Sequence, residues 1–312
     1  MTEFYPEGRL IASPANSSCL RSKMSLSEAC ADRRILEARA IICDAEHNLI
    51  VDLGCMKGII PREEGALGIK EGTVKDIAVI SRVNRPVCFI VESIDTDAHG
   101  NPLARLSRRR AQERCVDEKL SRLKIGDVTN GRVTHLESFG AFVDIGCGVI
   151  ALMPIDSISV SRIDHPSQRF CVGMDIRVII KNLDNGRISL SHKELLGSWE
   201  ENVRDFTPGE TVAGIIRSVE DYGAFVELTP NLAGLAELKE GIKAGQQASV
   251  YIKNIIPERM KIKLIIIDSF ESPEKIRPPK YFFLGDHLDR FLYSPENCSR
   301  RIETVFYQQQ QE

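Results

Sequence analysis

The sequence lacks the residue patterns that mark most enzymes, metal sites and disulfide frameworks. Its nine cysteines form no C-x-x-C pair, and an odd number of thiols does not suit a disulfide framework. The six histidines have no metal-ligand spacing, and there is no Walker phosphate loop or nucleophile with an evident base partner. We therefore expect no catalytic site, no metal, no cofactor and no small-molecule substrate, and a reducing compartment for the thiols.

Long apolar runs are also missing. No segment reaches the roughly 18 apolar residues of a membrane-spanning helix, and no signal-peptide core follows Met1. With 43% hydrophobic and 27% charged residues, the composition is that of a globular protein. The net charge of −3 argues against a protein that coats nucleic acid by charge alone. We expect a cytoplasmic protein with no membrane partner.

What the sequence does contain is a repeated aromatic hairpin. Residues 139–144 read FGAFVD, and residues 222–227 read YGAFVE. The match extends upstream, where Gly131 in the first of these copies aligns with Gly214 in the second. Internal repetition of this kind indicates tandem copies of one small domain.

The hairpin predicts a pair of exposed rings. Side chains alternate along a strand, but a glycine between two rings permits a bend that brings both to one face. Exposed rings on one face are costly unless something stacks on them, and nucleobases stack at about 1–3 kcal/mol each. The alternative is an ordinary pair of core rings. The side chains expected to point outward are Phe139, Phe142 and Asp144 in one copy and Tyr222, Phe225 and Glu227 in the other.

Each copy also has the strands of a small barrel. The strands are expected at 127–138, 140–146, 149–154, 174–184 and 186–191, and at 210–221, 223–228, 232–237, 247–256 and 260–267. Five short strands with a longer connection between the third and fourth describe a Greek-key barrel of the OB type. This fold binds oligonucleotides on the face of its second and third strands.

Both copies resemble the S1 RNA-binding domain, a family of OB-fold modules whose hairpin typically reads FGAFV. Residues 184–191 fit the closing D-x-x-G-R-I-x-L-S pattern of that family with one residue fewer. The resemblance implies RNA contacts by the two rings, by a histidine after the third strand, and by the Asp and Arg of the closing turn. The residues that match are Phe139, Phe142, Asp184 and Arg187 in one copy and Tyr222, Phe225 and the arginine equivalent Lys261 in the other.

Three departures from the family pattern weaken this correspondence. Pro154 and Glu237 occupy the histidine position in the two copies, and Ile256 replaces the closing aspartate in the later one. We therefore expect the copy with Phe139 and Phe142 to bind RNA better than the copy that follows it.

A degenerate copy lies upstream of these two. Residues 50–55 (IVDLGC) align with residues 142–147 (FVDIGC), but residues 47–50 (HNLI) supply no ring pair. Without stacking rings, this copy should bind RNA poorly, and it should either dock on protein or support the neighbouring barrel. Its segment 63–86 is longer than in the other copies, and we expect an added strand at 77–83.

The predicted architecture is all-β with helical connectors, built from three tandem five-stranded OB-fold barrels of the S1 type. A largely disordered and then helical segment (1–34) precedes a degenerate barrel (35–107), a basic helical linker (108–124), a barrel (125–191), a helical linker (192–207), a barrel (208–268) and a tail (269–312). We predict that the cluster Arg108, Arg109 and Arg110 also contacts RNA. Trp199 should pack its linker onto a barrel, the tail aromatics should pack back on the barrels, and the final glutamine run should be disordered.

The whole arrangement resembles a short form of the bacterial ribosomal protein S1 family. That resemblance implies a protein that holds messenger RNA at the small ribosomal subunit, with the first barrel docked on small-subunit proteins and the later two gripping single-stranded RNA. Two alternatives remain: an accessory RNA-binding factor in RNA decay or processing, and a protein-interaction scaffold that does not bind RNA. The scaffold predicts that the rings are covered.

Overall fold

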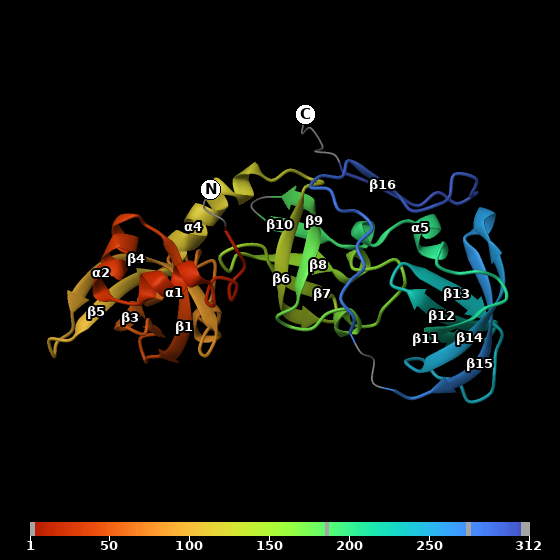
Figure 1. The fold of residues 1–312 in the computed structure, drawn as a ribbon, viewed down its shortest axis with the longest axis horizontal. Helices are drawn as coiled ribbons and strands as arrows, with labels where there is room; N and C mark the ends of the chain where they lie inside the picture. Colours follow the sequence, from red (N-terminus) through yellow and green to blue (C-terminus); the bar gives the residue numbers. More distant parts are fainter. Residues whose placement is uncertain (1–3, 185–186, 273–275, 307–312) are drawn as a thin grey trace. The chain divides into compact units, whose positions relative to one another are not determined.

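Three closed five-stranded barrels succeed one another along the chain (Figure 1). The structure is a computed structural model that describes residues 4–184, 187–272 and 276–306. The predicted fold class, all-β with helical connectors, is confirmed. Among the described residues, no helix has the length and apolar character that a membrane crossing requires.

The first barrel closes in the strand order β1-β2-β3-β5-β4. Its strands are β1 (Ile35–Cys43), β2 (Leu49–Asp52), β3 (Lys57–Ile60), β4 (Pro86–Thr96) and β5 (Pro102–Ser107). β3 and β5 pair in parallel, whereas the other neighbours are antiparallel. Alternating side chains such as Leu49, Val51 and Phe89 fill the interior, which is why these segments read as half-buried strands.

The long insertion after β3 forms short helices rather than the extra strand expected at residues 77–83. It holds the 3₁₀ helix η1 (Arg62–Glu64) and the α-helix α3 (Ile77–Ile80). The Ile80 N–H donates to the Asp76 carbonyl and the Ser81 N–H to the Ile77 carbonyl, both at 3.0 Å. The segment therefore satisfies its backbone groups locally, and the expected strand is wrong.

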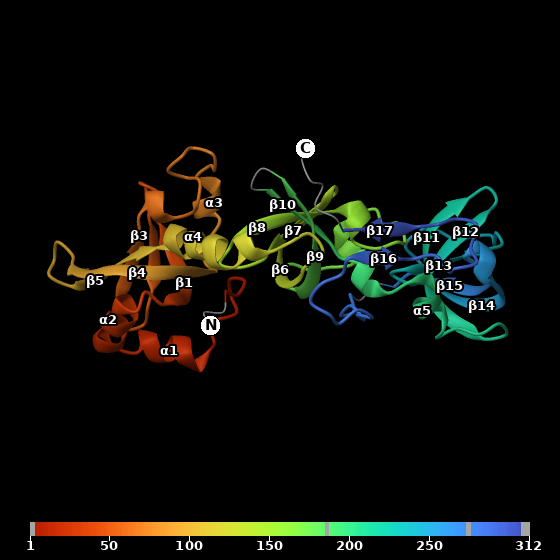
Figure 2. The same cartoon turned by 90° about the horizontal axis from the view of Figure 1, so that it is seen from above.

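The N-terminal segment is folded, contrary to the expectation that it is largely disordered. It forms α1 (Pro14–Leu20) and α2 (Lys23–Ala31), which contact β1 and β4 (Figure 2). Ser13 caps α1 by accepting the Asn16 N–H, and Ser22 forms a capping box with Ser25. Ser13, Pro14 and Ser22 therefore act as helix-start residues in a segment whose composition also resembles that of disordered chains. Residues 1–3 lie outside the described part.

The linker after the first barrel is helical. It consists of α4 (Arg108–Glu118) and the 3₁₀ helix η2 (Leu120–Arg122), and Ser107 caps α4 by accepting the Arg110 N–H at 3.0 Å. The chain divides into two compact units. The first unit runs to Leu123 and also contains Asp144–Ile150, and the second contains the remainder.

The second barrel has the strand order β10-β8-β7-β6-β9. Its strands are β6 (Val128–Glu137), β7 (Gly140–Asp144), β8 (Ile150–Pro154), β9 (Asp175–Asp184) and β10 (Arg187–Ser191). The connection from β8 to β9 holds two 3₁₀ turns, η3 (Ile155–Ser157) and η4 (Pro166–Gln168). As in the first barrel, the third and fifth strands, here β8 and β10, pair in parallel.

The third barrel repeats the same order as β11-β12-β13-β15-β14. Its strands are β11 (Thr211–Glu220), β12 (Gly223–Thr229), β13 (Leu232–Ala236), β14 (Gln247–Ile256) and β15 (Lys261–Phe270), with the 3₁₀ turn η6 (Pro257–Arg259) before β15. The linker to it contains η5 (Lys193–Leu196) and α5 (Trp199–Val203). Trp199 belongs to the core cluster of this barrel, as expected.

The C-terminal tail packs back on the barrels of the second unit. Its strands β16 (Arg290–Leu292) and β17 (Glu303–Val305) form a two-stranded sheet. The Tyr281 hydroxyl accepts the Arg177 N–H at 2.9 Å, and the Tyr293 hydroxyl donates to the Asn231 carbonyl at 2.5 Å. Tyr293 belongs to the core cluster of the third barrel, and Phe306 clusters with Ile179 of the second, so tail aromatics pack on the barrels, as the sequence suggested. The final glutamine run lies outside the described residues.

Candidate nucleic-acid interface

The second barrel carries the expected ring pair, with one ring exposed and the other half-buried. Phe139 lies in the turn before β7, and Phe142 lies on β7 itself. Their ring centroids are 6.0 Å apart at an interplanar angle of 88°, an edge-to-face contact. The Phe139 side chain is 54% exposed, and Phe142 is half-buried beneath it. The rings meet because Phe139 stands in the turn, where strict strand alternation does not apply.

The glycine of the hairpin is required by a close approach between strands. A Cβ atom on Gly140 would lie 2.4 Å from the Met153 carbonyl oxygen, and one on Gly223 would lie 2.6 Å from the Ala236 carbonyl oxygen. Both carbonyls belong to the third strand of their barrel. A larger residue would push this strand away and disturb the face that holds the rings.

The third barrel repeats the ring pair. Tyr222 and Phe225 are 6.2 Å apart between centroids at 87°, and Tyr222 is 69% exposed. Phe225 pairs in register with Leu235 on β13, and Leu235 pairs with Lys263 on β15. The exposed Lys263 thus lies in one row with Phe225 across the barrel. Sequence reasoning missed it, although the alternation of lysine and apolar residues from 261 to 264 was a usable signal.

The closing turns lie on the other side of the third strand from the rings. Asp184 and Arg187 face each other across the β9–β10 pair, and both are exposed. In the third barrel, Ile256 and the exposed Lys261 hold the same register positions. In both barrels the third strand pairs with the ring-bearing second strand on one side and with the fifth strand on the other. The Glu237 carboxylate, at the histidine position, faces Lys253 at 3.3 Å.

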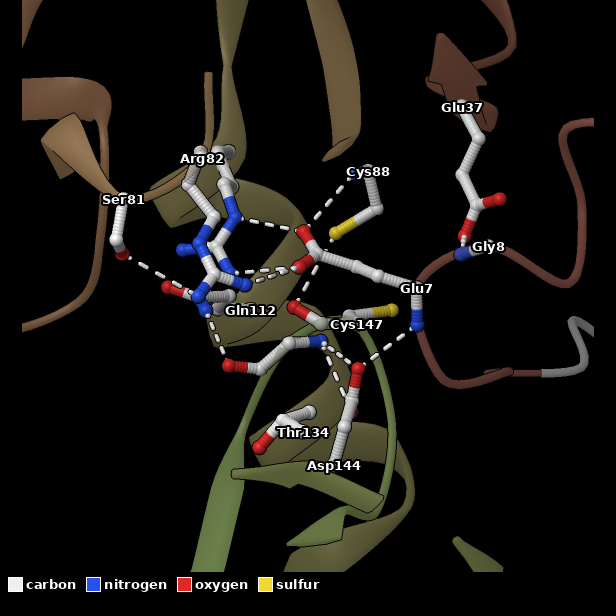
Figure 3. A network of polar contacts seen from close by, with 12 residues as sticks. Glu7, Gly8, Glu37, Ser81, Arg82, Cys88, Gln112, Thr134, Asp144 and Cys147 are labelled. Atoms are coloured by element: carbon white, nitrogen blue, oxygen red, sulfur yellow. Dashed lines mark hydrogen bonds and ion pairs between the residues drawn. The ribbon is translucent and has the colours of Figure 1, made fainter. Parts of the chain in front are cut away.

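Arg108, expected to contact RNA, is buried instead. It is 3% exposed, and its guanidinium makes a bidentate pair with Glu7, with Nε–Oε1 and Nη2–Oε2 distances of 2.7 and 3.0 Å. Arg82 lies 3.5 Å from the same carboxylate (Figure 3). Burial raises the pKa of Glu7, but the two guanidiniums outweigh it and hold that pKa below its usual value. The prediction for Arg108 is wrong because its guanidinium is buried and paired with Glu7 inside the first unit.

The two arginines that follow are also engaged with acids. Arg109 lies between Glu64 and Glu113, with nitrogen–oxygen distances of 2.8 and 2.5 Å. Arg110 pairs with Glu92 at 2.9 Å but keeps about half of its side chain exposed. The basic cluster predicted at 108–110 is therefore largely neutralised, because helix α4 packs against acidic strands and loops. Of the three, Arg110 alone retains substantial exposure.

The two acids expected beside the rings point inward. Asp144 accepts the backbone N–H groups of Glu7, Gly146 and Gly148 at 2.8–3.1 Å. Burial raises its pKa to about 7, and the nearby Glu7 charge adds to this. Glu227 is buried between Arg169 and Arg217, which it binds through salt bridges. The prediction of outward-pointing acids is wrong. Asp144 binds backbone N–H groups of a turn and Glu227 binds two arginines, and the alternation of the strand predicts neither contact.

One ring on the second barrel was not anticipated from the sequence. His135, on β6, lies 6.0 Å from Phe142 between ring centroids, with an interplanar angle of 34°. Its side chain is 62% exposed. Side chains two positions apart on a regular strand face the same way, so the buried Val133 predicts a buried His135. The sequence pattern therefore gave no sign that His135 is exposed. The equivalent strand of the third barrel has a register shift between Ile216 and Ser218, the positions that match Val133 and His135.

Comparisons with known proteins find relatives of the second barrel and of most of the chain. The S1 RNA binding domain model matches residues 122–193, which include the whole second barrel. A small ribosomal subunit protein bS1 from Staphylococcus aureus (strain COL) is 30% identical over 277 residues, covering 83% of this chain and 68% of that protein. This chain belongs to the bacterial ribosomal protein S1 family. A bS1 protein from Leuconostoc lactis is 32% identical over an alignment of 245 residues that covers 73% of this chain.

The sequence match does not extend over the full length of these relatives. The chain spans 55% of the Leuconostoc protein, so the S1 family members it matches are longer. Among solved structures, a multidomain protein with nucleic acid binding domains from Streptococcus pneumoniae TIGR4 covers 77% of this chain at 16% identity and a TM-score of 0.25. At that score the likeness supports no conclusion.

Proposed function

We propose that this S1-family protein binds single-stranded RNA, chiefly through the second barrel and more weakly through the third. The observation that carries the proposal is the exposed edge-to-face ring pair at the same hairpin in both barrels. Base–aromatic stacking contributes about 1–3 kcal/mol per base and tolerates any sequence. Asp184 and Arg187 in the second barrel, and Lys261 in the third, would add polar contacts to the same strand of RNA.

The exposure of the rings favours RNA binding over the scaffold alternative. A scaffold without RNA binding was expected to cover these rings, whereas Phe139 and Tyr222 are each more than half exposed in the chain. An exposed apolar pair held in a rigid turn is poorly hydrated, so a partner with flat π-faces is the natural occupant. Nothing specific favours the RNA-decay alternative.

We propose further that the chain acts in translation at the small ribosomal subunit, as a binding protein rather than an enzyme. The named bS1 relatives are small ribosomal subunit proteins. The partners would be messenger RNA and small-subunit proteins, in the cytoplasm. The first barrel, which lacks a ring pair, would make the protein contacts, while linking two RNA-binding barrels raises avidity through effective concentration.

Replacing the second-barrel rings tests the RNA proposal. The Phe139→Ala/Phe142→Ala variant of the full chain should bind single-stranded RNA about 2–5 kcal/mol more weakly, as expected for two lost stacks. Fluorescence anisotropy with a labelled oligonucleotide measures the affinity. Circular dichroism should show nearly unchanged thermal stability, because Phe139 is exposed and Phe142 lies at the surface.

Phe270→Ala provides the matched control. Phe270 is a 51% exposed ring at the end of β15, outside both ring pairs, so its loss should leave RNA affinity unchanged. Wild-type affinity in the Phe139→Ala/Phe142→Ala variant would overturn the proposal. Equal losses in the control and in the ring variant would show that exposed apolar surface in general, rather than this site, binds the RNA.

A further inference from the structure

The ring pair of the second barrel has a third aromatic neighbour. Phe142 contacts Phe139 edge-on at 88° and His135 at a shallow 34°, each with 6.0 Å between centroids. Both outer rings are more than half exposed. Phe142 is therefore the shared base of a three-ring surface made from β6, the turn and β7, which we call the three-ring platform (His135, Phe139 and Phe142).

A polar contact with Glu137 orients His135. Its Nε2 lies 2.6 Å from a Glu137 carboxylate oxygen, and because an ionised carboxylate only accepts hydrogen bonds, the imidazole donates. One residue earlier, the Thr134 hydroxyl donates to the Phe142 carbonyl at 3.1 Å and ties β6 to β7. A ring that is already oriented loses little conformational freedom when a ligand stacks on it.

The third barrel supplies a natural contrast. Ser218 occupies the position of His135 and pairs directly in register with Phe225, the equivalent of Phe142. In both barrels the first strand is the hydrogen-bonded neighbour of the strand that carries the second ring, and the side chain at this position differs. The third barrel has two rings at this surface where the second has three.

We propose that His135 is a third stacking residue for single-stranded nucleobases, and that it makes the second barrel the stronger RNA-binding module. The inference rests on the proposed RNA-binding function. Any base offers a π-face to such a platform, so the added ring should raise affinity for every sequence alike. The proposed contribution is stacking, since the imidazole Nε2 is already engaged with the Glu137 carboxylate, which would compete with a phosphate for it.

Substitutions of His135 in the full chain test the inference. The His135 variants are made in a Tyr222→Ala/Phe225→Ala background, which removes the ring pair of the third barrel. The probe is a labelled single-stranded RNA of about 12 nucleotides, within the site size of OB folds. His135→Ala should weaken binding about tenfold, and His135→Phe should stay within about twofold of the background protein. The reciprocal Ser218→His, made in the Phe139→Ala/Phe142→Ala background, should tighten binding several-fold.

The controls separate the possible failures. His99→Ala removes an exposed histidine from the turn after β4 and should change nothing. An unchanged affinity for His135→Ala overturns the inference, as does an equal loss in His135→Phe, which would indicate a hydrogen bond. A salt slope reduced by about 0.7 in His135→Ala would indicate a phosphate contact and also overturns it. If the Phe139→Ala/Phe142→Ala variant binds RNA as tightly as the wild type, the binding surface lies elsewhere and the inference falls with the proposed site. If the wild-type chain itself binds no single-stranded RNA, the proposed function fails.

Discussion

At the residue scale, the buried carboxylate of Glu37 makes the first unit sensitive to pH. Its oxygens accept the backbone N–H groups of Gly8, Leu10 and Ile11 at 2.9–3.0 Å. Burial, together with the nearby charge of Glu7, raises its pKa to about 7. A pKa that is higher in the folded than in the unfolded state means that folding favours the protonated form.

Glu37 therefore stabilises the first unit most below its unfolded pKa of about 4.5, and this contribution is lost as the pH rises through about 7. Between about pH 5 and pH 8, we expect the free energy of unfolding of this unit to fall by about 2 kcal/mol. Protection factors of the slowest amides in β1 and β4, measured by hydrogen exchange, report it. The Glu37→Gln variant should show a flatter pH dependence, and a wild-type unit that gains stability toward pH 8 would contradict this assignment.

At the element scale, helix α4 is a basic helix whose charges are mostly paired. Arg108 and Arg109 are held by glutamates at distances of 2.5–3.0 Å, and Arg110 pairs with Glu92. Charges engaged in this way would have to break ion pairs before they could bind phosphate. The helix therefore contributes little electrostatic attraction for RNA, despite a sequence that suggests it does.

The salt dependence of RNA binding should reflect this pairing. We expect a slope of log affinity against log salt on the order of −2 to −4 in the wild type, since few phosphates are neutralised. Arg109→Ala/Arg110→Ala should leave the slope unchanged. The contrasting Arg187→Ala, at the exposed closing turn of the second barrel, should reduce it by about 0.7. A wild-type slope steeper than about −6 would mean that charge rather than stacking dominates.

At the scale of the whole molecule, the three barrels share a topology but differ on the face where RNA would bind. In the first barrel, Ile50 stands at the position of Phe225. It pairs with Ile59 on β3, which pairs with Arg105 on β5, so these three neighbouring strands present no ring at this level. The matching row of the third barrel begins at Phe225 and reaches Lys263. Barrels with the same strand order therefore carry different surface residues. What each barrel binds depends on those residues and not on the fold.

A variant without any of the four paired rings should separate the two proposed activities. Phe139→Ala/Phe142→Ala/Tyr222→Ala/Phe225→Ala should lose measurable binding to single-stranded RNA but still co-sediment with small ribosomal subunits through the first barrel. Subunits treated to remove messenger RNA serve as the control for indirect association. RNA affinity close to that of the wild type would place the binding surface elsewhere, and loss of co-sedimentation would show that association with the subunit depends on RNA.

Features with a local physical cause could be read from the sequence. The period-two pattern identified the strands, the repeated Gly140 and Gly223 identified the hairpins, and five strands per copy indicated the barrel. The ring pairs were also predictable. The two rings of each pair are three residues apart, one in the turn and one on the following strand, so they meet without help from distant segments. Ser13, Pro14 and Ser22 start the two N-terminal helices, but the same residue types are common in disordered segments, so the expected disorder of this segment was wrong.

Contacts between distant segments were decided by the tertiary structure. Glu7 and Arg108 are 101 residues apart, and no local pattern connects them, yet their pairing removes Arg108 from the surface. The outward position of His135 departs from the regular alternation of its strand, which no periodicity predicts. The sequence by itself determined the repeated barrels and their aromatic hairpins, because strand period and turn chemistry are local. Only the tertiary structure decided which charges are free and which rings share a face, because both depend on what folding brings alongside.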